Sequence, residues 1–227
     1  RCEIDKNRAN ANKLMGRFLY GLKKKAEYAL ISLTGGQKDN AITRECTAEF
    51  LTDSVAEVKA YAKELQEQLR EEYTGSDENI TFEITEKGTA TAEVLHPTSQ
   101  EKIVFYLQNV PFGIQKMSGT IKAWWKPPAN IGILRLDRDE LFASSSVRSS
   151  VDAACSALSD KIEYLTEFLG GDYEVQGAYR HGSTERNLHY EIKWLQFLRK
   201  CMAISLKSLR STQALNVDFS IKNGRTG

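Results

Sequence analysis

Long apolar runs are absent from this sequence. No stretch approaches the roughly 20 consecutive apolar residues that a helix needs to cross a bilayer. Hydrophobic residues make up 41% and charged residues 27% of the 227 positions, proportions that are ordinary for a soluble globular protein. The chain has neither an initiator methionine nor a pattern typical of a signal peptide. We therefore expect Arg1 to be a cut end, and we expect no association with a membrane.

Closely spaced cysteines are also lacking. The four cysteines, Cys2, Cys46, Cys155 and Cys201, are far apart in the sequence, and no C-x-x-C pair occurs. Small secreted proteins that depend on disulfides use denser and more regular spacings. The cysteine pattern therefore favours a reduced, cytoplasmic setting over a disulfide framework.

The patterns of common active sites are missing as well. The three histidines, His96, His181 and His189, form no H-E-x-x-H, H-x-x-x-H or H-x-D motif, and no G-x-S-x-G elbow occurs. Gly35-Gly36 lacks the lysine and the strand–helix context of a phosphate-binding loop, so we predict a turn there. Trp124-Trp125 is a candidate ligand platform, although a core or subunit-contact strand fits better. These patterns predict no catalytic residue and no metal ligand in this chain.

Charge is distributed unevenly along the chain. Residues 180–227 hold nine Lys or Arg and three Asp or Glu, which gives a formal charge of +6. The total charge is +1, so residues 1–179 carry −5. The composition of the chain therefore changes near Tyr179, and we place a boundary there.

The stretch from Glu140 to Tyr179 has the clearest periodicity. Alternating residues up to Arg148 predict a strand, and apolar residues at helical spacing from Val151 to Leu169 predict a helix. Ser149 or Ser150 is the expected cap, and Gly170-Gly171 ends the helix before a second strand at 172–178. A helix between two strands must bury its apolar stripe against a sheet.

The rest of the chain predicts a similar alternation of helices and strands. The order strand–strand–helix–strand occurs at about 27–86 and again at 131–178. We therefore predict an α+β fold, an antiparallel sheet with helices packed on one face in ferredoxin-like units, followed by an irregular C-terminal tail. The other expected elements are helices from Asp5 or Asn7 to Lys25, from Ser54 (capping box with Glu57) to Tyr73 and from Thr98 (capped with Glu101) to Leu107, strands at 27–33, 44–51, 80–84 and 131–137, and a break at Pro127-Pro128.

Two polar residues are candidates for ligand binding. Arg148 is expected near a strand end beside a helix N-terminus, where its planar guanidinium could hold a carboxylate. Asn40 lies in the loop that follows Gly35-Gly36. Spacing alone favours an exposed strand arginine and a simple turn asparagine over these binding roles.

Four segments resemble the lid domain of bacterial aminoacyl-histidine dipeptidases, which are also called cytosol non-specific dipeptidases. They occur in the family's order and span most of residues 3–179. These enzymes are di-zinc exopeptidases of the aminoacylase/carboxypeptidase clan. The segments are EIDKNRANANKLMGRFLY at 3–20, GGQKDNAITRE at 35–45, NIGILRLDRDELFASSSVRSSVD at 130–152 and LGGDYEVQGAY at 169–179.

The resemblance implies a role in holding a substrate. In that family the lid is inserted in a zinc-bearing catalytic domain, closes over the dipeptide and contributes to homodimer formation. Asn40 matches a lid asparagine that contacts the substrate, and Arg148 matches a lid arginine that binds the carboxylate of dipeptides such as Xaa-His. The zinc ligands, the catalytic glutamate and its aspartate partner are expected outside this chain, and the family's G-G-H-S-G motif does not precede Glu3. The isolated chain is therefore expected to be inactive.

The sequence of residues 180–227 departs from the family. Codons exist for this segment that, regrouped one base earlier, encode a continuation with the family's H-A-G-L-E-C-G motif. We therefore interpret 1–179 as the lid/dimerisation domain and 180–227 as a frameshifted or non-native tail that is poorly ordered. In that case His181 and His189 have no role in metal binding.

The alternative is a native, basic tail. Its apolar residues fit one helical face, which could bind nucleic acid or an anionic membrane. The chain would then be a stand-alone homodimeric interaction module that recruits an acidic partner, and a small-ligand regulatory domain is a further alternative. The residues on that face are Trp194, Leu195, Leu198, Met202, Leu206 and Leu209.

Overall fold

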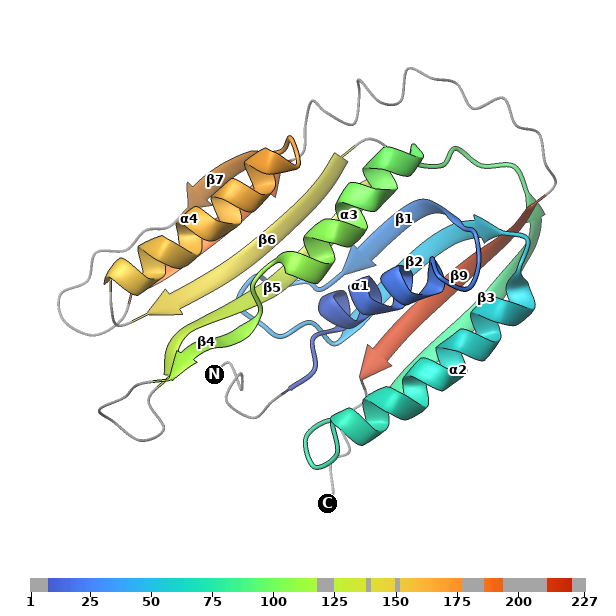
Figure 1. The fold of residues 1–227 in the computed structure, drawn as a ribbon, viewed down its shortest axis with the longest axis horizontal. Helices are drawn as coiled ribbons and strands as arrows, with labels where there is room; N and C mark the ends of the chain where they lie inside the picture. Colours follow the sequence, from blue (N-terminus) through green and yellow to red (C-terminus); the bar gives the residue numbers. More distant parts are fainter. Residues whose placement is uncertain are drawn as a thin grey trace.

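A single antiparallel sheet carries the helices of the described residues on one face (Figure 1). The computed structural model describes residues 8–117, 125–137, 140–149, 152–176, 186–193 and 212–221. The nine strands follow the order β3-β9-β2-β1-β5-β6-β8-β7, with β4 beside β5. The elements are α1 (Ala11–Leu22), β1 (Ala29–Gly35), β2 (Glu45–Thr52), α2 (Val55–Glu72), β3 (Ile80–Ala90), α3 (Pro97–Asn109), β4 (Gly113–Met117), β5 (Trp125–Asp137), β6 (Glu140–Ser149), α4 (Asp152–Phe168), β7 (Asp172–Gln176), β8 (Arg186–Lys193) and β9 (Thr212–Ile221).

The sheet consists of two similar halves that meet at β1 and β5. In each half a helix precedes a hairpin, and a second helix then leads to an outer strand: α1-β1-β2-α2-β3 in one, α3-β5-β6-α4-β7 in the other. The strands β1 and β5 pair antiparallel, with Leu33 opposite Leu136 and Gly35 opposite Leu134. The sheet order therefore reads the same from either end, and the predicted recurrence of strand–strand–helix–strand is confirmed.

Polar contacts cap the first turn of α1 and join α1 to the end of α3. Asn10 caps α1, because its side-chain oxygen accepts from the backbone N–H groups of Asn12 and Lys13. The expected start at Asp5 or Asn7 is therefore wrong. Further along, Lys13 Nζ donates to the carbonyls of Leu107 and Val110, at 2.5 and 3.1 Å, at the end of α3. Burial lowers the pKa of Lys13 to about 8.

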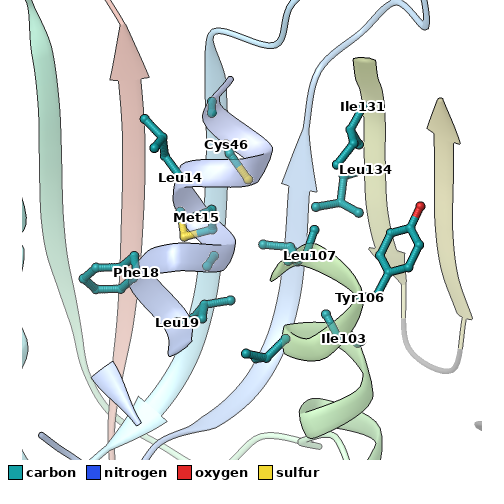
Figure 2. Close-up of a cluster of buried hydrophobic side chains, with 14 of the residues drawn as sticks. Leu14, Met15, Phe18, Leu19, Cys46, Ile103, Tyr106, Leu107, Ile131 and Leu134 are labelled. Carbon is teal, nitrogen blue, oxygen red and sulfur yellow. The ribbon is translucent and has the colours of Figure 1, made fainter. Parts of the chain in front are cut away.

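The core lies between the helices and the sheet (Figure 2). Leu14 and Phe18 of α1 are buried, as are Ile131 and Leu134 of β5. Tyr106 of α3 is fully buried, and this burial raises the pKa of its hydroxyl. The two central helices therefore share one apolar core with the central strands.

Two predicted helix caps differ from the observed ones. Ser54 is the N-cap residue of α2, but its side chain makes no capping hydrogen bond, so the predicted capping box with Glu57 is wrong. The Thr52 hydroxyl instead accepts from the Ser54 backbone N–H. In α3 the cap is His96, whose Nδ1 accepts from the Thr98 N–H at 3.2 Å. Proline at the first position of α3 needs no donor there, and the cap lies two residues before the predicted Thr98, so that prediction is wrong.

The pair Pro127-Pro128 does not interrupt the strand, contrary to the prediction. β5 runs from Trp125 to Asp137, and Pro128 lies opposite Ile114 of β4. Proline removes one backbone donor, which a strand tolerates where one of its sides is unpaired. The register of β5 with β6 begins at Ala129, just after the two prolines. Trp124 lies outside the described residues.

The expected irregular tail contains two strands of the sheet. In each half, a helix joins two parallel strands that leave room for one antiparallel strand between them: β8 lies between β6 and β7, and β9 lies between β2 and β3. The prediction of an irregular tail is therefore wrong for these two segments, because each supplies the backbone partner that both neighbouring strands require. The predicted helical face at 194–209 lies outside the described residues.

The side chains of β9 alternate between the core and the opposite face. Leu215, Val217 and Phe219 are buried, whereas Asn216 and Asp218 are half-buried. The ring of Phe219 meets that of Phe82 in β3 edge-on, with centroids 4.9 Å apart. This period of two is the pattern of a strand with one core face.

Truncation of Phe219 tests whether β9 belongs to the fold. We expect Phe219→Ala to lower the free energy of unfolding by about 3–5 kcal/mol, because the side chain is buried and leaves a cavity. Urea denaturation followed by circular dichroism measures this change. The matched control is Phe105→Ala, since Phe105 is 45% exposed and should cost far less. Equal stability of the Phe219 variant and the unchanged protein would mean that β9 does not pack as described.

Candidate functional site

The loop between β1 and β2 packs closely against β5. Gly36 has φ +73, and a side chain there would place its Cβ 1.8 Å from the carbonyl oxygen of Gly132. A Cβ on Gly132 would likewise lie 2.2 Å from the Asp39 carbonyl oxygen. Both positions therefore require glycine. Gly35 is the last residue of β1, so the chain leaves the strand only at Gly36, one residue later than the predicted turn begins.

A buried amide holds this loop on both sides of Asn40. Asn130 is 1% exposed, and its Nδ2 donates to the carbonyl of Asp39 at 3.2 Å and to that of Ala41 at 2.8 Å. Its Oδ1 accepts from Nδ2 of Asn10 at 3.1 Å, so the cap of α1 joins the same network. The backbone around Asn40 is therefore fixed relative to β5.

Thr43 completes the attachment of the loop. Its hydroxyl lies 3.0 Å from the Ile131 carbonyl and 2.8 Å from the Gly132 carbonyl, and it accepts from Asn12 Nδ2 at 3.2 Å. The Thr43 carbonyl accepts from the Ala11 N–H at 2.8 Å. The register of β5 against β6 shifts between Ile131 and Ile133, so the loop covers an irregular part of the strand.

Asn40 lies on the surface of this anchored loop. Asn40 is exposed, and its backbone N–H donates to Asp39 Oδ1 at 2.7 Å. The carbonyls on either side of it are held inward by Asn130. The loop therefore presents Asn40 outward from a fixed base.

Arg148 lies near the end of β6, where its backbone is opposite Asn187 of β8. Its side chain lies outside what the structure describes. Asn130 is opposite Ser146, two residues before Arg148, and the same Asn130 holds the Asn40 loop. The strands β1 and β6 run in the same direction, because each is antiparallel to β5, so both finish at the same end of the sheet. The register thus brings the two predicted residues to one end of the sheet.

The anchoring residues were not predicted from the sequence. Asn10, Asn12, Thr43 and Asn130 are each at most 2% exposed, and all are polar. Their signal in the sequence is the presence of small polar residues at positions that fold into the core. Buried polar groups of this kind are nearly always hydrogen-bonded, so they mark places where two segments must meet.

Neither a metal cluster nor a spanning helix is found in the part of the chain that the structure describes. No group of three or more His, Cys, Asp or Glu side chains there is arranged to hold a metal ion. None of the described helices is both long enough and apolar enough to cross a membrane.

Replacing Asn130 by alanine tests the anchoring of the loop. We expect Asn130→Ala to destabilise the protein by about 1–3 kcal/mol, because the carbonyls of Asp39 and Ala41 lose their buried donor. Hydrogen exchange of residues 36–43 should become faster, as mass spectrometry can measure. The control is Asn109→Ala, whose exposed amide bonds only to Phe105 in its own helix. Unchanged exchange in the loop of the Asn130 variant would contradict the anchoring role.

Three comparisons show which known proteins this chain is similar to. Residues 2–77 match the peptidase dimerisation domain of the M20 family, a segment that holds α1 to α2 of the first half. The chain is 26% identical over 179 residues to a cytosol non-specific dipeptidase of Escherichia coli. A solved structure, the aminoacylhistidine dipeptidase of Vibrio alginolyticus, superposes with a TM-score of 0.61 and 26% identity.

The two relatives are much longer than this chain. The matches cover 78% of the chain but 37% of the Escherichia coli protein, and 74% of the chain but 35% of the Vibrio structure. The chain thus spans about a third of the length of the relatives it matches. The resemblance drawn from four short segments is confirmed: the chain is similar to part of these two dipeptidases, and residues 2–77 are similar to the peptidase dimerisation domain.

Proposed function

We propose that this chain is the lid/dimerisation part of a zinc-dependent dipeptidase and that it holds the substrate. The observation that carries the proposal is the network of Asn130, which fixes the Asn40 loop against β5, the strand that pairs with β6 and thus with the strand that carries Arg148. Supporting it, the relatives are named as dipeptidases. The substrate is a dipeptide such as Xaa-His with a free carboxylate.

The two residues have complementary roles in this proposal. The guanidinium of Arg148 binds the substrate's terminal carboxylate through two parallel hydrogen bonds. The amide of Asn40 contacts the peptide from the neighbouring loop. An anchored carboxylate fixes the position of the peptide bond one residue away, and this positioning is how a lid contributes to hydrolysis.

The hydrolytic step itself requires groups that the described residues do not supply. They do not fit a zinc site, so we propose that zinc in the complete enzyme is held by its catalytic part. The isolated chain is then inactive. A cytoplasmic location is part of the same proposal, and the name of the Escherichia coli relative as a cytosol enzyme supports it.

Homodimer formation also belongs to the proposal. The match of residues 2–77 to a dimerisation domain supports it. The rival interaction module requires the basic tail to be available to an acidic partner, nucleic acid or a membrane. The strands β8 and β9 are instead paired on both sides within the sheet, which favours the lid function over that module.

The division of the chain at residue 179 and the frameshift remain predictions. Sequencing the gene across the Tyr179 codon tests them. A single-base change that restores the H-A-G-L-E-C-G motif would support the frameshift, and its absence would leave residues 180–227 as a native segment.

Removal of the Arg148 guanidinium tests substrate binding. We expect Arg148→Gln to weaken binding of a free dipeptide at least about tenfold, because a charge-assisted contact is lost. Ligand-observed NMR titration measures binding, and the same dipeptide with an amidated C-terminus should bind the unchanged protein as weakly. The control is Arg135→Gln, an exposed arginine of β5. The role of Arg148 would be contradicted if Arg148→Gln bound the free dipeptide as tightly as the unchanged protein does. It would also be contradicted if the unchanged protein bound the free and the amidated dipeptide equally well.

A further inference from the structure

The outer side of α4 exposes two large aromatic residues. Tyr164 is 72% exposed and Phe168 is 71% exposed, and their rings lie next to each other with centroids 6.4 Å apart. They are the most exposed large hydrophobic residues in the described part of the chain. In Figure 1, α4 lies at the outer margin of the helical layer. Exposed aromatic pairs of this kind are typical of interaction surfaces.

The first half of the exposed face of α4 carries small side chains instead of aromatic ones. Small side chains, Ala153, Ser156 and Ala157, occupy the first half of the same face, whereas the aromatic pair occupies the last turns. Asp160 and Lys161 lie between them. The exposed positions recur every three or four residues and form a single stripe.

We propose that a second copy of this chain binds here, with the two α4 helices packed antiparallel. A two-fold axis between Lys161 and Tyr164 places Phe168 of each copy opposite Ala157 of the other. Large side chains then meet small ones on both sides of the axis, as a self-complementary interface requires. This inference rests on the proposed homodimer and assigns its surface to α4 of the second half, outside residues 2–77 that match the dimerisation domain.

The charges on the stripe fit the same arrangement. The axis places Lys161 opposite the Tyr164 ring of the other copy, where a cation–π contact is favourable. Glu167 lies one turn from that tyrosine, so the lysine also comes near an opposite charge. A parallel arrangement of the helices would instead place the aromatic pairs together and each charge beside its like.

The centre of the molecule is not available for this contact. The strands β1 and β5 already pair with each other, and α1 already packs against α3 through Lys13. These pairings leave β1, β5 and the α1–α3 contact without a free partner for a second copy. The stripe on α4 can receive a second copy without breaking any described contact.

Replacement of the aromatic pair tests the interface in the full chain. We expect the unchanged protein to sediment as a dimer and Tyr164→Glu/Phe168→Glu to dissociate about a hundredfold more readily. Circular dichroism and the melting temperature should show that the variant is folded. The matched control is Tyr20→Glu/Phe105→Glu, which changes two exposed aromatic residues on α1 and α3 and should remain a dimer.

A charge reversal gives a second measurement. Lys161→Glu should weaken the dimer, and Lys161→Glu combined with Glu167→Lys should restore part of the affinity. If the unchanged protein is a monomer, both the proposed homodimer and its α4 interface are wrong. If it is a dimer that survives both the aromatic and the charge variants, the homodimer stands and the α4 interface is overturned.

Discussion

One buried side chain, the amide of Asn130, connects the parts of this protein that matter for its proposed function. Its donors hold the carbonyls of Asp39 and Ala41, and its acceptor takes a hydrogen bond from the cap of α1. An unsatisfied buried amide is costly, so each partner must stay in place while the others do. The exposed Asn40 is thereby held beside a strand whose own neighbour carries Arg148. In the proposed function, this part of the chain contributes by fixing the position of Asn40.

The two-fold character of the sheet explains why this position lies near the middle of the molecule. Two similar halves meet at β1 and β5, and the Asn40 loop leaves the sheet directly after β1. The dimerisation-domain match covers elements of the first half only. In both halves the gap between parallel strands is filled by a strand from beyond residue 179. Strands from beyond residue 179 therefore complete the sheet in both halves of the described structure.

Much of the fold could be predicted from the sequence, because its helices and strands follow their periodicity. The helix ending at Gly170-Gly171 and the repeated strand–strand–helix–strand order are observed. What failed depends on contacts that the residue pattern does not determine. The pattern around Ser54 could not show that its side chain leaves the cap unfilled, and it could not show that the prolines of β5 precede the pairing with β6. The role of β9 was missed because the interpretation followed composition rather than the alternation from Leu215 to Phe219.

The candidate site was predicted in part. Asn40 and Arg148 came from the resemblance, and the backbone register brings them to one end of the sheet, while their roles stay predictions. Asn130, which anchors the loop, gave no comparable signal, since a lone asparagine before an apolar strand is as typical of a turn as of a buried tie. Its importance depends on which carbonyls approach it, and this information is not local in the sequence.

The most direct test of the central claim is a map of where a free dipeptide contacts the chain. Backbone amide chemical shifts, recorded with and without the dipeptide, report the contacted residues. The account predicts that the largest changes fall in the 36–43 loop and at the end of β6 near Arg148, and that they vanish when the dipeptide carboxylate is amidated. Changes that are concentrated elsewhere, or that are the same for the amidated dipeptide, would contradict it.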